Sequence, residues 1–192
     1  MAVNGRRTSV ISSGDAEMKS TRWVSKFTNS VLVQVFKHFP WLAERWARSH
    51  QFIEGKGIPW TPLGKPLREC RIAMVTTAGV HLKSQPPFNM EDPDGDATFR
   101  AFPADVDKTD LTITHKYYDH SAADSDINVV LPIDRLQELR DEGVIGNITS
   151  TLYSFMGHID GPHVKTLMEE TAPEVAELLV RDGAEAVFLT PT

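Results

Sequence analysis

Cysteine, long apolar runs and positive charge are all scarce in this chain of 192 residues. The single cysteine, Cys70, excludes an internal disulfide and a zinc site made of several thiolates, and it is typical of a reducing compartment. No apolar run is long enough to span a membrane, and the first residues lack the apolar core of a signal peptide. A formal net charge of −6 argues against a broad nucleic-acid-binding surface. These absences predict a soluble, cytoplasmic protein that binds neither membrane nor nucleic acid.

The chain has enough apolar residues for one core, and its composition divides it into three parts. Hydrophobic residues make up 41% of the sequence. Residues 1–20 are polar and rich in serine, so we expect a disordered tail. Residues 21–58 carry apolar side chains at helical spacing on both sides of Pro40. They predict a helical extension that packs on the domain or on a partner subunit or, as a weaker alternative, lies on a membrane surface. Residues 59–192 form the predicted α/β domain.

Strand patterns alternate with helix patterns through this third part. Short apolar runs predict strands at Arg71–Thr77, Leu111–His115, Ile148–Phe155 and Ala186–Leu189. Helical spacing predicts helices at Ile133–Glu142 and, with an interruption at Pro173, at about Gly161–Arg181. This alternation is typical of a three-layer α/β sandwich with a mainly parallel sheet. The polar loop Leu82–Asp110 is long for a compact domain, which indicates a functional or mobile segment.

The last stretch, GAEAVFLTPT, follows a helix pattern and contains the almost wholly apolar run Ala186–Leu189. We predict that this run is a buried strand of the parallel sheet. In open α/β sheets, ligands bind just beyond the carboxyl ends of the strands. Thr190 should therefore lie at the entrance to a site.

The densest group of ionisable side chains follows the second predicted strand and contains His115, Asp119, His120 and Asp124. Their nitrogen and oxygen atoms could hold a divalent metal ion. The same groups could act as general acids and bases. A purely structural alternative is that the aspartates cap turns and the histidines bond to the backbone.

A second group of polar residues follows the first predicted strand. Gly79 would let the backbone approach a ligand closely, and the hydroxyls of Thr76 and Thr77, together with Lys83, would hold a carboxylate. His81 lies in the same turn. The sequence contains no nucleophile elbow, phosphate-binding glycine-rich loop or dinucleotide fingerprint, which argues against those classes of enzyme.

Four ordered motifs between Pro59 and Thr192 resemble one protein family. They are VTTAGVHLKSQPPF, THKYYDHSAADSDINVVLPIDRL, GVIGNITSTLYSFMGHI and GAEAVFLTPT. Together they resemble the selenoprotein B subunits of the glycine, sarcosine, betaine and D-proline reductases, in particular the D-proline-reductase-like branch. The resemblance implies an oxidoreductase subunit that reductively cleaves a C–N bond of an amino acid or related amine. Thiols would be the reductant and would end as a disulfide.

In this family a selenocysteine or cysteine directly follows the LTPT motif and attacks the substrate carbon. The printed sequence ends at Thr192, so we expect this redox residue to come next, encoded by UGA at codon 193, and the α/β domain to be incomplete at its C-terminus. The resemblance further implies that the chain itself carries no other cofactor and that a partner subunit supplies a pyruvoyl group, which activates the substrate amine. We also expect an oligomer.

Two sets of residues form the predicted site, and no metal is assigned to it. The candidate catalytic residues are His81, His115, His120 and Asp124. The candidate substrate-binding residues are Thr76, Thr77, Gly79, Lys83, Tyr118 and Thr190. We predict that the strand ends bring Thr77, His81, His115, His120 and Thr190 into a common crevice. Two alternatives stay open: a catalytically inactive binding or regulatory subunit, and a metal-dependent enzyme built on His115, His120 and Asp124.

Overall fold

The computed structural model describes residues 35, 38–49, 61–116 and 118–192. The chain divides into two compact units, Met1–Pro59 and Trp60–Thr192, and each is described by itself. The predicted tail, residues 1–20, lies outside the described residues, as does the predicted extension, residues 21–58, apart from residues 35 and 38–49. In the first unit, helix α2 (Pro40–Ser49) begins at a proline, whose fixed φ and missing N–H suit the first turn of a helix.

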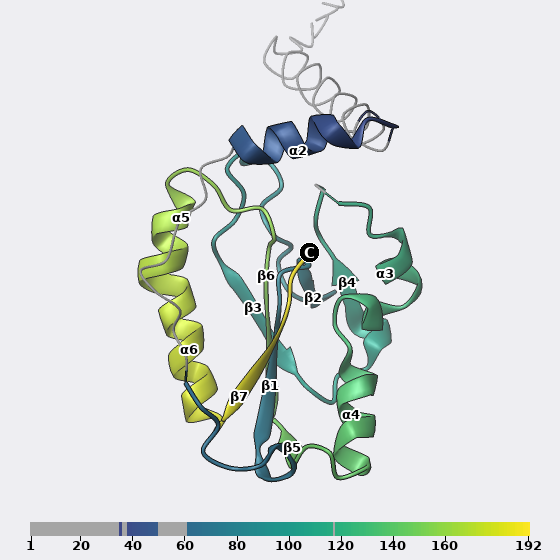
Figure 1. The fold of residues 1–192 in the computed structure, drawn as a ribbon, viewed down its shortest axis with the longest axis vertical. Coiled ribbons are helices and arrows are strands. Elements are labelled where there is room, and N and C mark those ends of the chain that lie inside the picture. Colours follow the sequence, from purple (N-terminus) through teal and green to yellow (C-terminus); the bar gives the residue numbers. More distant parts are fainter. Residues whose placement is uncertain (1–34, 36–37, 50–60, 117) are drawn as a thin grey trace, which may run out of the picture. The chain divides into compact units, whose positions relative to one another are not determined.

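The second unit is built around a five-stranded, mostly parallel sheet (Figure 1). The central strand β1 (Arg71–Thr76) pairs in parallel with β7 (Ala186–Thr190) and also with β5 (Asn147–Ile148) and β6 (Thr151–Phe155). Strand β3 (Phe99–Pro103) runs antiparallel to β6. The prediction of an α/β fold with a mainly parallel sheet is therefore confirmed.

The predicted strand Ile148–Phe155 is interrupted. β5 pairs with the start of β1 and β6 pairs with its end, in different registers. At the break, the Thr149 hydroxyl donates to the Thr151 carbonyl (3.0 Å). The Asp182 carboxylate accepts from the Ser150 hydroxyl (2.7 Å) and from the Thr151 N–H (3.1 Å). These side-chain hydrogen bonds satisfy the N–H and the carbonyl of Thr151 at the break between the two strands.

Helices lie on both sides of the sheet (Figure 1). They are α4 (Ile133–Asp141), α5 (His163–Thr166) and α6 (Ala172–Arg181). A π-helical turn, Leu167–Thr171, separates α5 from α6, and Pro173 lies in the first turn of α6. This arrangement agrees with the interruption predicted near that proline.

Successive residues of β1 point to opposite faces of the sheet and so enter two different cores. Met74 belongs to the buried cluster that includes Leu136 of α4. Val75 belongs to the cluster that includes Leu179 of α6. Because both faces of β1 are covered, its sequence reads as a continuous apolar run and not as an alternating one.

The second predicted strand, Leu111–His115, is not part of the main sheet, and the prediction that its end joins that sheet is wrong. The segment forms β4 (Leu111–Ile113), which pairs antiparallel with β2 (Val80–Leu82) in a separate two-stranded sheet. β1 already pairs along both edges, so no edge is available to β4. Gly79 has a φ of +70°, and its carbonyl accepts from the Thr114 N–H (2.9 Å). The chain therefore turns out of the main sheet after β1.

β7 is an exposed edge strand, in contrast to the buried strand that its composition predicts. It pairs with β1, and in the described part of the chain no strand pairs with its other edge. Val187, Phe188 and Leu189 are 42%, 47% and 66% exposed. Apolar composition does not distinguish a central strand from an edge strand, because burial depends on what packs against it.

Short elements complete the second unit. They are the 3₁₀ turns η1 (Leu67–Glu69), η2 (Lys108–Asp110) and η3 (Ile127–Val129), and the short helix α3 (Ser121–Ser125). Of the helices in the described part of the chain, none combines the length and the apolar character needed to cross a lipid bilayer.

Candidate functional site

The carboxyl ends of β1, β6 and β7 meet at one edge of the sheet because these strands are parallel. The Thr77 N–H donates to the Thr190 carbonyl (3.1 Å), and the Thr192 N–H donates to the Thr77 hydroxyl (3.0 Å). The Thr192 hydroxyl in turn donates to the Thr77 carbonyl (3.0 Å). The predicted meeting of the first and last strand ends is confirmed, and it places the LTPT motif beside Thr77.

Gly157, which follows β6, is the point on which three segments converge. A Cβ atom at this position would lie 3.0 Å from His115 Nε2, 3.0 Å from the Thr77 carbonyl oxygen and 3.2 Å from the Thr192 carbonyl oxygen. The missing side chain therefore lets His115 approach the ends of β1 and β7. Gly157 is not among the predicted site residues, although a glycine shortly after a predicted core strand is a usable signal.

We expect Gly157→Ala to disturb this edge. The new methyl group would meet two backbone carbonyls and a buried ring at distances shorter than ordinary van der Waals contact. Overpacking of this kind costs about 1–3 kcal/mol. The loss in the free energy of unfolding can be measured by denaturant titration. Gly64→Ala is the matched control, because nothing lies within 4 Å of its Cβ position. Equal stability of the two variants would show that the edge is loosely packed.

The His115 imidazole is neutral at pH 7. Burial, together with the charges that His158 and His120 carry when protonated, lowers the pKa of His115 to about 4. The residue is 9% exposed. A neutral imidazole has one donor and one acceptor nitrogen. The ring therefore brings no positive charge to the strand ends.

Tyr118, His120 and Asp124 continue in a row from His115. The Tyr118 ring centroid lies 4.7 Å from that of His115 and 5.6 Å from that of His120, edge-on to both. Asp124 Oδ2 lies 2.7 Å from His120 Nδ1. Burial, with a smaller contribution from the Asp124 charge, raises the pKa of Tyr118 to about 12, so its hydroxyl stays protonated. The structure thus brings four of the predicted site residues into one continuous group.

The hydroxyls of two predicted substrate-binding residues face the interior. Thr76 is fully buried. The Thr76 and Thr190 hydroxyls both donate to the Val130 carbonyl, at 2.9 and 2.8 Å. These bonds tie β1 and β7 to the segment before α4. Direct contact of either hydroxyl with a ligand stays a prediction.

His81 and Gly79 also contact the protein itself. His81 is 3% exposed, with Nδ1 2.8 Å from the Leu82 carbonyl and Nε2 2.8 Å from the Thr114 hydroxyl. A Cβ at Gly79 would lie 2.4 Å from the Thr114 carbonyl oxygen. The close approach that the sequence predicted at this glycine is therefore made by the chain's own backbone. These contacts support the turn after β1.

Lys83 and Asp124 line an open cavity of about 540 Å³ beside β4. In residues 61–116 and 118–192, as in the rest of the described chain, no group of three or more His, Cys, Asp or Glu side chains is placed to hold a metal ion. The metal-dependent alternative built on His115, His120 and Asp124 stays a prediction.

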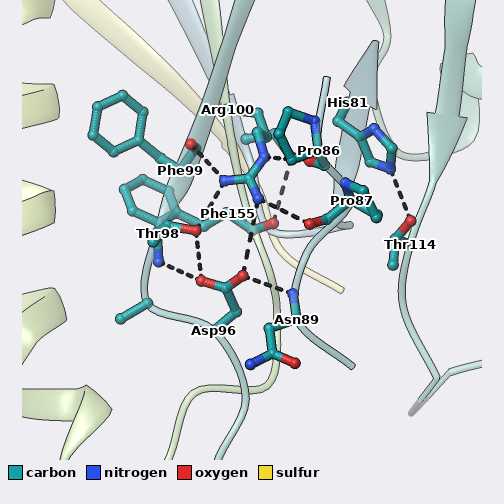
Figure 2. A network of polar contacts seen from close by, with 12 residues as sticks. His81, Pro86, Pro87, Asn89, Asp96, Thr98, Phe99, Arg100, Thr114 and Phe155 are labelled. Atoms are coloured by element: carbon teal, nitrogen blue, oxygen red, sulfur yellow. Dashed lines mark hydrogen bonds and ion pairs between the residues drawn. The ribbon is translucent and has the colours of Figure 1, made fainter. Parts of the chain in front are cut away.

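The long loop after β2 is anchored by Arg100 of β3 (Figure 2). The guanidinium donates to the carbonyls of Pro86 (2.9 Å) and Pro87 (3.1 Å) and lies 4.3 Å from the centroid of the Phe88 ring. Phe88 is buried, and its ring contacts His81 edge-on at 6.1 Å between centroids. The loop is therefore held both to β3 and to the turn that carries His81.

A second set of contacts holds the same loop to the segment after β6. Gly95 and Ile159 form an isolated antiparallel bridge. His158 Nε2 lies 2.8 Å from the Pro93 carbonyl. His158, which comes shortly after β6, thus fixes the loop beside Gly157.

Asp96 is the buried acceptor of the Arg100 network (Figure 2). Its carboxylate accepts from the Asn89 N–H (2.8 Å) and the Thr98 N–H (2.8 Å), and Arg100 Nη2 lies 4.0 Å away. Burial by itself raises the pKa of Asp96, but the hydrogen bonds from Thr98 and Asn89 and the Arg100 charge outweigh it. The pKa of Asp96 is therefore held below its usual value.

Asp96→Asn should lower the free energy of unfolding by about 1–3 kcal/mol at pH 7, because one acceptor oxygen is lost at a buried site. A carboxyl group whose pKa is lowered by folding stabilises the protein at pH values above its unfolded-state pKa of about 4. This stabilisation is lost as the pH falls through the folded-state pKa. The difference between the two proteins should therefore shrink below pH 4. Urea titrations at pH 7 and pH 3 measure it. A difference that grows on acidification would contradict the assignment.

The fold and this edge together define an α/β protein of the kind that binds ligands beyond the carboxyl ends of parallel strands. The model of the family described as glycine/sarcosine/betaine reductase selenoprotein B matches residues 42–192, and the chain belongs to this family. The family predicted from the four motifs is therefore confirmed.

Curated relatives support the predicted branch. The chain is 40% identical to the D-proline reductase subunit gamma of Acetoanaerobium sticklandii over 131 residues. The aligned region covers 68% of this chain and 52% of that protein. It is 34% identical to the glycine reductase complex component B subunit gamma of Symbiobacterium thermophilum over 140 residues. This aligned region covers 70% of this chain and 31% of that protein. It is 28% identical to the sarcosine reductase complex component B subunit beta of Peptoclostridium acidaminophilum over 141 residues. This aligned region also covers 70% of this chain and 31% of that protein.

The chain therefore spans about half the length of the first relative and about a third of the other two. No solved structure matches it.

Proposed function

We propose that the chain is a selenoprotein B-like subunit of an oxidoreductase complex that reductively cleaves the C–N bond of an amino acid or related amine. Family membership supports the proposal, as do the relatives, which are components of D-proline, glycine and sarcosine reductases. The observation that carries it is the convergence of Thr77, His115 and Thr192 around Gly157, at the edge where the LTPT motif ends.

The resemblance puts the redox residue of the family, a selenocysteine or cysteine, directly after this motif. Its selenolate or thiolate would displace the amine from the substrate carbon, and thiols would then release the reduced product and end as a disulfide. Such a nucleophile has to be accessible in a cleft, which suits the end of an edge strand. A pyruvoyl group on a partner subunit would activate the amine.

The side chains of this chain would orient the substrate and supply a proton. His115 is neutral, so it can hydrogen-bond the substrate beside the redox residue without adding a charge there. His120, held by Asp124, would give a proton to the leaving amine. Tyr118 packs between the two rings and fixes their separation.

We further propose that the complete domain is a three-layer α/β sandwich that works in an oligomer with partner subunits. The two cores on opposite faces of β1 support this architecture. The thiol reductant suits a reducing compartment such as the cytoplasm.

The test is thiol-dependent turnover by the full-length protein with its partner subunits. D-proline, glycine, sarcosine and betaine are offered in turn with dithiothreitol. We expect one of them to be consumed with one equivalent of oxidised dithiothreitol formed. A complex with the redox residue replaced by alanine is the control. If dithiothreitol is oxidised no faster than in this control with any of the four compounds, a binding or regulatory subunit is favoured.

A further inference from the structure

The last strand of the main sheet leads into a segment whose residues are each held in place. The Thr190 hydroxyl donates to the Val130 carbonyl (2.8 Å), which anchors the segment to the interior. Pro191 has a fixed φ and no N–H, so it donates no bond to the ladder. Thr192 then pairs with Thr77, which follows β1. The backbone that leaves β7 is therefore restrained at both of its threonines.

Hydroxyl groups, and not the backbone ladder, make the pairing of Thr77 with Thr192. The Thr77 N–H donates to the Thr190 carbonyl (3.1 Å), and the next bond of a parallel ladder would join the Thr192 N–H to the Thr77 carbonyl. Instead, the Thr192 N–H donates to the Thr77 hydroxyl (3.0 Å), and the Thr192 hydroxyl donates to the Thr77 carbonyl (3.0 Å). The two side chains thus continue the pairing of β1 with β7 beyond the strand ends.

These contacts account for the proton of each hydroxyl. A threonine hydroxyl has one proton to donate. The Thr192 hydroxyl gives its proton to the Thr77 carbonyl, so Thr77 is the donor in the contact of 3.3 Å between the two hydroxyls. The Thr77 hydroxyl therefore donates within the protein. While the pair is closed, it has no proton left with which to hold a substrate carboxylate.

The closed pair lies where the site residues converge. A Cβ atom at Gly157 would lie 3.0 Å from the Thr77 carbonyl oxygen, 3.2 Å from the Thr192 carbonyl oxygen and 3.0 Å from His115 Nε2. The Thr192 carbonyl is the last group before the following residue, so its placement sets where that residue begins. Thr77 is half-buried and Thr192 is exposed, and neither belongs to the two buried cores. Loss of the pair would therefore leave both cores intact.

We propose that Thr77 is a positioning residue: through its hydroxyl it fixes the direction in which the chain leaves β7, and so holds the redox residue beside His115. The inference rests on the proposed function, because the redox residue directly follows Thr192 in that proposal. It gives Thr77 a role that differs from contact with the substrate. A displacement of about 1 Å between reacting groups can cost about 10²-fold in rate, so the loss of such a restraint should be measurable.

The first test measures amide hydrogen exchange by NMR on the full-length protein labelled with ¹⁵N-threonine. In Thr77→Val the Thr192 N–H loses its acceptor, so its exchange should become about three- to tenfold faster, the factor that corresponds to one hydrogen bond. Thr77→Ser keeps the hydroxyl and should keep the exchange rate of the parent protein. The Thr109 N–H, which donates to the Asp107 carboxylate (2.9 Å), is the internal reference and should exchange at the same rate in all three proteins.

The second test is steady-state kinetics of the complete reductase with the same variants. Thr77→Val should lower kcat about 10- to 10²-fold and change KM by less than about twofold, because the redox residue is displaced while substrate binding is kept. Thr77→Ser should keep kcat within about threefold of the parent value, since the hydroxyl bond is retained. Thr171→Val is the matched control, because it removes a hydroxyl that donates to the Ala97 carbonyl (2.8 Å) outside the site. Its kcat should equal that of the parent protein.

Thr192→Val breaks the pair from its other side, since it removes the hydroxyl that donates to the Thr77 carbonyl. Its kcat should fall in the same direction as that of Thr77→Val. The double variant should lose less than the product of the two single losses, because both substitutions break one pair. A loss equal to that product would show that the two hydroxyls act independently and would contradict the proposal.

Three other results would overturn the proposal: unchanged exchange of the Thr192 N–H in Thr77→Val, an equal loss of kcat in Thr77→Ser, or a raised KM with an unchanged kcat. The last of these would assign Thr77 to substrate binding. The exchange measurement needs no thiol, partner subunit or turnover. Faster exchange in Thr77→Val, in a complex that consumes none of the four compounds, would count against the proposed function alone. A normal kcat of Thr77→Val in an active complex would count against the role of Thr77 alone.

Discussion

His115→Gln should lower the kcat of the complete reductase by about 10²–10³-fold, the usual loss when one preorganised hydrogen-bonding group is lost from its position. The reason is the position of its Nε2 atom, 3.0 Å from the point where Thr77 and Thr192 also converge. Glutamine is neutral, like the His115 ring, and it keeps a donor and an acceptor, so thermal stability should change little. It does not hold these groups where the ring holds them, so activity should fall much more. Steady-state kinetics beside thermal melts of the same preparations measures both effects.

The matched control is His163→Gln, in which the altered ring pairs with Asp92 (3.0 Å) outside the site. Its kcat should equal that of the parent protein. Because the pKa of His115 is lowered to about 4, this ring stays neutral above about pH 5 and should produce no step in kcat between pH 6 and pH 8. Full activity of His115→Gln, or a step in that range that disappears with the substitution, would contradict the role given to His115.

His120→Ala should also reduce turnover, by about 10²-fold or more, because it removes the proposed proton donor. Asp124→Asn should have a smaller effect of the same direction, since it weakens the bond at 2.7 Å that holds the His120 ring. Unchanged turnover in both variants would remove this pair from the mechanism.

Gly79→Ala should lower the free energy of unfolding by about 3–5 kcal/mol, the sum of backbone strain and overpacking. Gly79 has a φ of +70°, and its Cβ would lie 2.4 Å from the carbonyl oxygen of Thr114. That carbonyl belongs to the backbone that leads from β4 to His115, so relief of the clash has to move the β2–β4 sheet. Denaturant unfolding at 25 °C, with a thermal melt as a second measurement, checks the size of the loss.

Gly143→Ala separates the two contributions. Gly143 has nearly the same φ, +71°, but nothing lies within 4 Å of its Cβ position. Alanine there should cost only the strain of the left-handed conformation, about 1–2 kcal/mol. A loss of the same size in both variants would mean that conformation alone, and not the contact with Thr114, determines the need for glycine at position 79.

The sequence by itself determined the elements whose signals are local. Continuous apolar runs located β1 and β7, helical spacing located α4, and Pro173 marked the start of the helix after the π turn. The alternation of strands with helices then predicted a mainly parallel sheet, and parallel strands necessarily end at the same edge. That is why the sequence also predicted that Thr77 and the LTPT motif meet. The four motifs identified the family.

Tertiary structure alone decided which of those elements pair with one another and which are buried. β4 lies outside the main sheet because both edges of β1 are already paired, which no property of the segment Leu111–His115 reveals. β7 is exposed although its composition is that of a buried strand. The convergence of His115, Thr77 and Thr192 on Gly157 joins segments that are far apart in the chain. Burial and close approach depend on such long-range packing, whereas periodicity and turn chemistry depend on neighbouring residues, and only the latter can be read from sequence.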